Sequence, residues 1–286
     1  MSTSRLEDAL EHRESGRNWQ LEGNAAELYQ RYLVPAITTK WAEDLITRAQ
    51  LRMGDAVLDL ACGTGVVARL AAKRLAPGQV TGLDLNAGML AVARGVPDGA
   101  TISWMEGSAL DLPFGDESFD VVLCQLGLQF FPDQPKALRE MWRVLRPAGR
   151  IGLSVFSPIE RTPGAHAFAR AIDKVFGAHA SRIKRGEHCF SDPADLETLL
   201  RGADFASIDV QTVTQILTFP SVLDYVRFQL VATPQKVLLR DRHGAEHEEI
   251  IATVASETAR LSTLTMQHGG AFTFPQEAYV AFARPR

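Results

Sequence analysis

The stretch VLDLACGTGVVARLA, residues 57–71, joins an apolar run, a glycine-bracketed loop and a helical pattern. The run that ends at Leu60 is typical of a buried strand, and the apolar spacing after Gly65 is typical of a helix. Gly63 and Gly65 allow the backbone to turn tightly and to approach a ligand where a Cβ atom would collide. The helix begins with free N–H groups and the positive end of its dipole. This stretch therefore predicts a strand, a loop and a helix that hold a ligand.

The alternation of strands and helices continues beyond this stretch. Apolar strands that are separated by crossover helices indicate a parallel sheet covered on both faces. Ligands of such sheets lie beyond the carboxyl ends of the strands, so we expect the site in the loops that follow the strands. We predict strands at 56–60, 80–83, 101–105, 119–124 and 150–155, and helices at 66–75, 87–94 and 134–145.

The regions on either side of this alternating core have different patterns. Residues 24–50 read as two helices that are broken near Pro35, because a proline ends a helix at the residue before it. The alternation stops after Ser157, and a capped helix within 191–205 follows. Strands are then predicted at 207–219 and 277–285, with helical patterns between 220 and 267.

The composition is that of an ordinary globular protein. Of the 286 residues, 46% are hydrophobic and 22% are charged, and the net charge is -4. This charge supplies no positive field toward phosphate backbones, so we expect no nucleic-acid partner. The amino-terminal segment lacks the apolar region of a signal peptide, and no apolar run reaches the ~20 residues of a membrane helix. Three dispersed cysteines without metal-like spacing predict reduced thiols, no metal site and a cytoplasmic location.

Two acidic residues bear on which ligand the glycine loop holds. The letters GTGVVA fit the fingerprint of a dinucleotide-binding loop. Asp59, four residues before Gly63, would repel a pyrophosphate but suits the positively charged amino group of S-adenosylmethionine. Asp84 ends the second predicted strand and can accept both ribose hydroxyls of either cofactor. S-adenosylmethionine is therefore favoured, and a dinucleotide is the alternative.

Five motifs in register resemble the class I S-adenosylmethionine-dependent methyltransferases, in particular the ubiquinone and menaquinone C-methyltransferases. They cover residues 24–155 closely and 190–210 weakly. The resemblance implies an α/β fold with a Rossmann-like seven-stranded sheet, mostly parallel, whose last strand is antiparallel and inserted beside the fifth and sixth. It implies S-adenosyl-L-methionine as cofactor and S-adenosyl-L-homocysteine as product. The motifs are VLDLACGTG, GLDLNAGML, EGSALDLPFGDESFDVV, CQLGLQFFPD and MWRVLRPAGRIGLSV.

The resemblance also implies roles for single residues. The segment from Asp59 to Gly65 would wrap the methionine part, Asp84 would hold the ribose, and Met89 would cover the adenine. Related enzymes usually carry an acidic residue where this chain has Ser108, so Ser108 itself or Asp111 would accept from the adenine amino group. Tyr29 and Tyr32 resemble aromatic residues that close over the cofactor, and helix packing is the equal alternative for them. The predicted cofactor-binding residues are Asp59, Ala61, Gly63, Gly65, Asp84, Leu85, Met89, Gly107, Ser108, Ala109, Gln125, Tyr29 and Tyr32.

Methyl transfer is an in-line displacement that needs a base only if the nucleophile starts protonated. Weak catalytic candidates are His166, His188 and Gln129, and an ordinary surface or capping role is favoured for both histidines. Lys184, beside Arg182 and Arg185, could bind an acidic group of the substrate, but a solvated face is the favoured interpretation. Cys62 is interpreted as a small structural residue of the glycine loop.

The leading hypothesis is methyl transfer to a small-molecule acceptor that is aromatic, quinone-like or a specialised metabolite. We expect no membrane insertion and a monomer or homodimer. The alternatives are an NAD(P)-dependent oxidoreductase, which would share the loop and Asp84 but would not need Asp59, and a non-catalytic S-adenosylmethionine-binding relative. We expect a polar extension at 1–23 and a single domain at 24–286, with lid elements at 24–50, 157–202 and 220–267.

Overall fold

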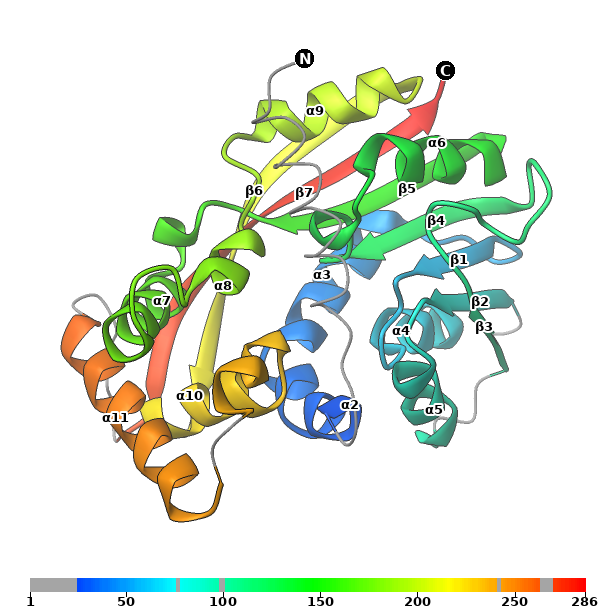
Figure 1. Cartoon of the computed structure of the whole chain (residues 1–286). Helices are drawn as coiled ribbons and strands as arrows, with labels where there is room; N and C mark the ends of the chain where they lie inside the picture. The colour runs from blue at the N-terminus through cyan, green and yellow to red at the C-terminus, as the bar shows by residue number, and fades with distance from the viewer. Residues whose placement is uncertain (1–24, 76–77, 98–100, 241–242, 263–269) are drawn as a thin grey trace.

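The chain folds around a seven-stranded sheet in the order β3-β2-β1-β4-β5-β7-β6 (Figure 1). The computed structural model describes residues 25–75, 78–97, 101–240, 243–262 and 270–286, so the predicted extension at 1–23 lies outside the described residues. Strands β1 to β6 run parallel to one another, and β7 lies antiparallel between β5 and β6. The predicted α/β sheet with an inserted antiparallel last strand is confirmed.

The first half of the chain has the predicted alternation of strands and helices. The main difference is at β5, which begins at Leu145 directly after the preceding helix rather than at residue 150. The elements are β1 (Ala56–Leu60), α4 (Val66–Leu75), β2 (Gln79–Asp84), α5 (Ala87–Gly95), β3 (Ile102–Glu106), β4 (Phe119–Gln125), η2 (Leu128–Phe130), α6 (Gln134–Val144) and β5 (Leu145–Phe156).

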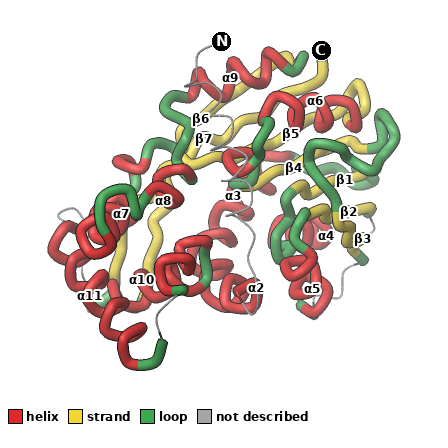
Figure 2. Tube along the Cα trace, viewed as in Figure 1, coloured by secondary structure: helices red, strands yellow, loops and turns green. Residues whose placement is uncertain are grey.

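Helices cover both faces of the central strands, which are therefore mostly apolar (Figure 2). All five residues of β1 are buried. Val57 belongs to the core cluster that includes Leu45 and Ala68, on one face of the sheet. Leu58, whose side chain points the other way, belongs to the cluster that includes Leu138. Burial on both faces fixes the position of the end of β1, and therefore the position of the loop that follows it.

The amino-terminal helix passes Pro35 without the predicted break, so that prediction is wrong. The chain runs through α2 (Ala25–Leu28), the π-helix η1 (Tyr29–Thr38) and α3 (Thr39–Ala49). In an α-helix a proline ring clashes with the carbonyl four residues earlier. Here the hydrogen bonds span five residues, as the bond from the Thr39 N–H to the Val34 carbonyl shows. The wider turns accommodate the proline and keep the helix continuous.

The second half of the chain carries most of the helices outside the parallel sheet. The predicted capped helix is confirmed, with Asp192 as its N-cap and Asp195 completing a capping box. The predicted helical segment between the last two strands is also confirmed. The elements are η3 (Ile159–Arg161), α7 (Pro163–Phe176), α8 (Arg182–Gly186), α9 (Pro193–Gly202), β6 (Phe205–Phe219), α10 (Val222–Val231), η4 (Pro234–Leu239), α11 (Ala245–Leu261) and β7 (Phe272–Pro285).

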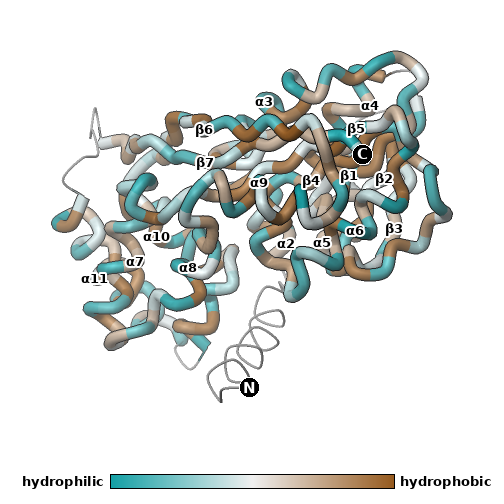
Figure 3. The backbone as a smooth tube through the Cα atoms, turned by 90° about the horizontal axis from the view of Figure 1, so that it is seen from above, coloured by the Kyte–Doolittle hydropathy of each residue, from teal (hydrophilic) through white to brown (hydrophobic). Residues whose placement is uncertain are grey.

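Strands β6 and β7 extend well beyond the rest of the sheet. Strand β5 pairs with β7 only between Ala278 and Ala283, whereas β6 follows β7 back to Phe272. Helices α7, α8, α10 and α11 gather at this projecting end, and β1 to β3 lie at the opposite end of the molecule (Figures 1 and 3). The molecule therefore has two sides, with the amino-terminal helices between them.

Candidate active site

A cavity of about 480 Å³ lies where these two sides meet, at the carboxyl ends of the parallel strands. One part of its wall comes from the loops after β1, β2, β3 and β4. The other part comes from η1, α8, α10 and the projecting ends of β6 and β7. This position agrees with the rule that ligands of open parallel sheets bind beyond the carboxyl ends of the strands.

The glycine loop after β1 contributes to the cavity unequally. Ala61 and Gly63 line the cavity, and both have positive φ angles of 55°. Gly65 has a φ of 84° but does not line the cavity. A Cβ atom at Gly65 would come within 2.2 Å of the Trp104 ring. Gly65 is therefore required for packing of the loop, whereas Gly63 lies on the surface that a ligand would touch.

Asp84 joins the loops after β1 and β2 and faces the cavity. One carboxylate oxygen accepts from the Gly63 N–H at 2.7 Å, and the other accepts from the Asn86 N–H at 2.8 Å. Burial raises the pKa of the Asp84 carboxyl, although these N–H groups act in the opposite direction. A carboxylate has about four acceptor positions, so the group can hold the loop and still accept from a ligand hydroxyl.

Asp59 lies deeper than the predicted contact with a ligand suggests. It is 1% exposed, and its carboxylate accepts from the Ala68 N–H of α4 at 2.8 Å. It does not line the main cavity but lines a small adjoining hollow, together with Tyr29, Ala61 and Gln125. Burial raises the pKa of Asp59 to about 8. A cation in the hollow would remove this cost, because an adjacent positive charge favours the ionised carboxylate.

The loops after β2 and β3 form the next part of the wall. Ser108 lines the cavity, and its hydroxyl accepts from the Leu110 N–H at 3.1 Å. Asp111, the alternative partner for an adenine, is exposed and does not line the cavity. Five further predicted residues line the cavity at this position: Leu85, Met89, Gly107, Ala109 and, from β4, Gln125.

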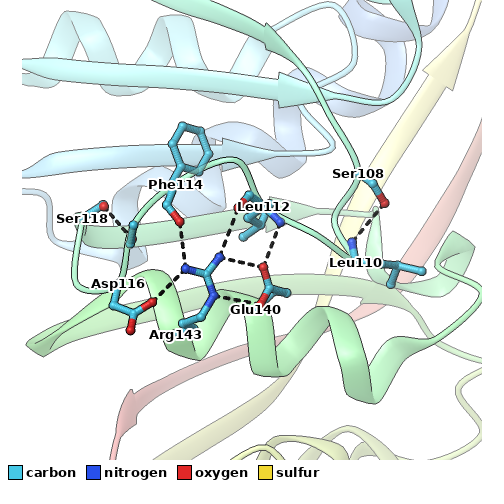
Figure 4. A network of polar contacts seen from close by, with 9 residues as sticks. Ser108, Leu110, Leu112, Phe114, Asp116, Ser118, Glu140 and Arg143 are labelled. Carbon is cyan, nitrogen blue, oxygen red and sulfur yellow. Dashed lines mark hydrogen bonds and ion pairs between the residues drawn. The ribbon is translucent and has the colours of Figure 1, made fainter.

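Arg143 of α6 fixes the loop that follows Ser108, as Figure 4 shows. Its guanidinium donates to the carbonyls of Leu112 and Phe114 at 3.1 and 2.8 Å. It also pairs with Glu140 at 2.7 Å, and Glu140 accepts from the Leu112 N–H at 2.8 Å. The ion pair lowers the pKa of Glu140. The sequence analysis missed this brace, whose signal is the i,i+3 spacing of Glu140 and Arg143.

The two tyrosines of the amino-terminal helix have different environments. Tyr29 lines the cavity and the hollow, and burial raises its pKa to about 12. Tyr32 does not line the cavity; its ring stacks on Phe228 of α10 at 4.5 Å between centroids. Of the pair, only Tyr29 is placed to touch a ligand. Gln125 links the end of β4 to this helix, because its amide donates to the Thr38 carbonyl of η1 at 3.1 Å.

None of the three catalytic candidates lines the cavity. His188 is buried, with Nδ1 2.7 Å from the Ser157 carbonyl oxygen, and burial lowers its pKa to about 3. His166 lies half-buried on α7, and burial lowers its pKa as well. Gln129 is buried in η2. None of the three is therefore placed to contact a ligand in this cavity, and His188 is buried rather than at the surface.

Lys184 is buried, so the favoured interpretation of a solvated face is wrong for this residue. It is 5% exposed and pairs with Glu187 at 2.6 Å. Both residues line the cavity. The second Glu187 oxygen accepts from the Gln235 amide at 2.9 Å, because α8 packs against η4. Arg185, by contrast, lies at the surface beside Asp173.

The described residues show no group of three or more histidine, cysteine, aspartate or glutamate side chains arranged to hold a metal ion. Cys62 and Cys124 are free and buried, and burial raises the pKa of the Cys62 thiol. This supports a structural role for Cys62 in the loop. Among the helices that the structure describes, none has both the length and the hydrophobicity needed to span a membrane.

Comparison with known proteins places the chain in a family. Residues 58–153 match the sequence profile described as a methyltransferase domain. The demethylmenaquinone methyltransferase of Symbiobacterium thermophilum is 39% identical over 193 residues, which are 60% of this chain and 76% of that protein. The demethylmenaquinone methyltransferase of Lactobacillus johnsonii is 39% identical over 118 residues, 40% of this chain and 48% of the relative. The chain thus spans about half the length of some relatives and three quarters of another.

Solved structures share the fold at lower identity. A putative methyltransferase from Bacillus halodurans has a TM-score of 0.56 and 23% identity, with 86% of this chain and 99% of that chain covered. Phosphoethanolamine N-methyltransferase 2 of Haemonchus contortus, in complex with S-adenosyl-L-methionine, has a TM-score of 0.54 and 17% identity, with 86% and 53% covered. These comparisons give no support to the oxidoreductase alternative. The chain belongs to the class I S-adenosylmethionine-dependent methyltransferase family.

Proposed function

We propose that this protein transfers a methyl group from S-adenosylmethionine to a small, largely apolar acceptor. The observation that carries the proposal is one cavity with two unlike walls. One wall holds Gly63, Asp84 and Ser108 from the strand-end loops. The other wall holds apolar side chains such as Ile37, Leu217 and Phe274. A cofactor on the first wall and an acceptor on the second would share one enclosed space.

The residues of the first wall fit S-adenosylmethionine. Asp84 faces the cavity with a carboxylate that can accept from ribose hydroxyls, and Ser108 and Met89 line the cavity on the side where we propose the adenine binds. The hollow beside Asp59 suits the positively charged amino group. Gln125 lines both spaces, and its buried Oε1 has no hydrogen-bond partner among the residues that the structure describes. When bound, S-adenosylmethionine supplies an electrophilic methyl group on a positively charged sulfur.

The second wall suits an aromatic or quinone-like acceptor. Its apolar residues come from η1, β6 and β7, and two relatives are demethylmenaquinone methyltransferases. From the names of these relatives we propose a quinone-like acceptor for this chain. We also propose that 24–286 acts as one domain in which η1, α8 and α10 close over the acceptor, in a cytoplasmic monomer or homodimer.

The protein's contribution to the reaction is orientation and exclusion of water. No histidine of the described residues lines the cavity, and Tyr29, with its pKa raised to about 12, stays protonated near neutral pH. Holding two reactants in line inside a dry site can supply on the order of 7 to 11 kcal/mol of the barrier. Tyr29, Gln125 and the Gly63 loop are the groups placed to hold that alignment.

Two measurements test the proposal. Calorimetric titration should show binding of S-adenosylhomocysteine and none of NAD⁺, and incubation with methyl-labelled S-adenosylmethionine should label a naphthohydroquinone acceptor. Binding of NAD⁺ alone would contradict the proposal in favour of an oxidoreductase. Binding of S-adenosylhomocysteine without labelling of any acceptor in a cell extract would favour the non-catalytic relative.

A further inference from the structure

The apolar wall of the cavity is interrupted by a buried ion pair. Lys184 and Glu187 are 5% and 7% exposed, and both line the cavity. They come from α8 and the residue that caps it, and α8 lies on the other side of the molecule from β2 and β3 (Figures 1 and 3). They also lie outside residues 58–153, which match the methyltransferase profile. The pair is therefore a feature of the acceptor wall and not of the cofactor motifs.

The polar groups around this pair are incompletely satisfied. Gln229 of α10 lines the cavity and is 2% exposed, and its Oε1 has no hydrogen-bond partner among the described residues. The Gln235 amide donates to Glu187, but within the same part of the chain its own buried Oε1 has no partner. Among the described residues, the Lys184 ammonium donates to Glu187 alone, and an ammonium has three N–H donors. Lys184, Glu187 and Gln229 thus line one cavity with hydrogen-bonding capacity to spare, and Gln235 lies behind Glu187.

A purely structural role does not explain this arrangement. Removing two charges from water is costly, and a well-packed hydrophobic pair is often at least as stabilising. Buried polar groups are normally satisfied, so an unpartnered amide oxygen at a cavity surface indicates a missing partner. A hydroxyl group fits best, because it can accept from the ammonium and donate to an amide or carboxylate oxygen. An anion would meet the Glu187 carboxylate, and a cation would meet Lys184.

We propose that Lys184, Glu187 and Gln229 bind a hydroxyl group of the methyl acceptor and so select hydroxylated aromatic acceptors over purely apolar ones of the same size. This inference rests on the proposed function, because it places the acceptor on this wall. The inference adds to the proposed function a set of residues that determine acceptor specificity by binding a polar substituent. A site built to bind a hydroxyl rejects the analogue without it, because its polar groups are then left unpaired.

The test compares two probes that differ in this group alone, 1-naphthol and 1-methylnaphthalene. Equilibrium dialysis with the full chain, with and without saturating S-adenosylhomocysteine, gives the two dissociation constants. The wild-type protein should bind 1-naphthol about tenfold more tightly than 1-methylnaphthalene. Calorimetric titration of S-adenosylhomocysteine on the same samples reports the cofactor site separately. If the cofactor assignment were wrong, S-adenosylhomocysteine would not bind in the calorimetric titration, while the preference between the two probes could still be measured.

Two variants assign the preference to residues. Lys184→Met with Glu187→Leu removes both charges together, so that neither remains buried without its partner. Gln229→Leu removes an amide oxygen that has no partner among the described residues, so we expect this variant to fold as the wild type does. The double variant should lose the preference, and Gln229→Leu should reduce it about threefold or more. S-adenosylhomocysteine affinity should be unchanged in both.

A matched control is the exposed ion pair of Lys174 and Glu257, which joins α7 to α11 at 2.8 Å. Lys174→Met with Glu257→Leu makes the same chemical change outside the cavity and should keep the preference for 1-naphthol. A wild-type protein that does not favour 1-naphthol would overturn the inference. So would a retained preference in both the double variant and Gln229→Leu, since the hydroxyl would then be bound elsewhere.

Discussion

The two walls of the cavity differ in how they are built. The cofactor wall consists of loops that each follow a strand of the parallel sheet, and each loop holds its residues within a short stretch of sequence. The acceptor wall is assembled from η1, α8, α10 and the projecting ends of β6 and β7, which are far apart in the chain. The first wall is therefore set by local motifs, and the second is set by helix packing. Variants that damage one wall should spare the other.

The largest effect is expected at Gly65, which supports the cofactor wall from behind. Gly65→Ala places a Cβ atom 2.2 Å from the Trp104 ring and forces alanine into a positive φ. The strained backbone and the overlap should together lower the free energy of unfolding by about 2 to 4 kcal/mol, as measured by urea denaturation.

The matched control is Gly202→Ala at the end of α9, where a Cβ atom would meet nothing within 4 Å. Alanine in a helix should be neutral or stabilise by up to about 1 kcal/mol. Equal unfolding midpoints for the Gly65 and Gly202 variants would contradict the packing role of Gly65.

The next effect isolates ligand binding on the cofactor wall. Asp84→Ala should weaken S-adenosylhomocysteine by about 1.5 to 3 kcal/mol, because two charge-assisted hydrogen bonds to the ribose are lost. Calorimetric titration measures this, and Asp111→Ala is the control because Asp111 is exposed and does not line the cavity. If the Asp111 variant loses affinity and the Asp84 variant does not, the ribose and adenine positions are wrongly assigned.

The brace behind the β3 loop should have a smaller effect. Arg143→Met removes the donors to Leu112 and Phe114 and leaves Glu140 without its ion pair. The expected loss in the free energy of unfolding is about 1 to 2 kcal/mol, measured by urea denaturation. Arg260→Met, which breaks an exposed pair with Glu257, should stay within about 0.5 kcal/mol of the wild type. Equal losses for both would show that the brace adds nothing beyond a surface ion pair.

The pH dependence of cofactor binding sharpens the contrast further, because it concerns Asp59 in the hollow that adjoins the cofactor wall. Asp59 has a pKa raised to about 8 without a ligand, and a bound amino group would lower it. The carboxyl must then lose its proton on binding, so affinity for S-adenosylhomocysteine should fall as pH drops from 8 to 7, by about tenfold at most. Asp59→Asn should remove this dependence. A flat profile for the wild type would contradict the contact with the amino group.

The same contrast explains what the sequence could predict. Ala61, Gly63, Asp84 and Ser108 line the cavity as expected, because a motif at the end of a buried strand has a fixed place at the sheet edge. Gly65 occupies a position of the glycine motif, but its role is packing. The ring that it packs against belongs to Trp104 of β3, which lies two strands away in the sheet, so the local sequence pattern does not reveal the contact.

The acceptor wall was harder to predict for physical reasons. The charged run around Lys184 resembles a solvated surface, and only the packing of α8 against η4 buries it. The break expected at Pro35 follows from α-helix geometry and fails because the chain forms a π-helix there. Tyr29 and Tyr32 have the same residue type, yet the helix turns one to the cavity and the other to Phe228.

The most direct test of the two-walled site is a crystal structure of the full chain with S-adenosylhomocysteine bound. We predict that the ribose hydroxyls contact Asp84 and that the amino group enters the hollow beside Asp59. The part of the cavity at Lys184 and Glu187 should stay open for an acceptor. S-adenosylhomocysteine bound against Lys184 and Glu187, with no contact to Asp84, would contradict the division of the cavity into cofactor and acceptor walls.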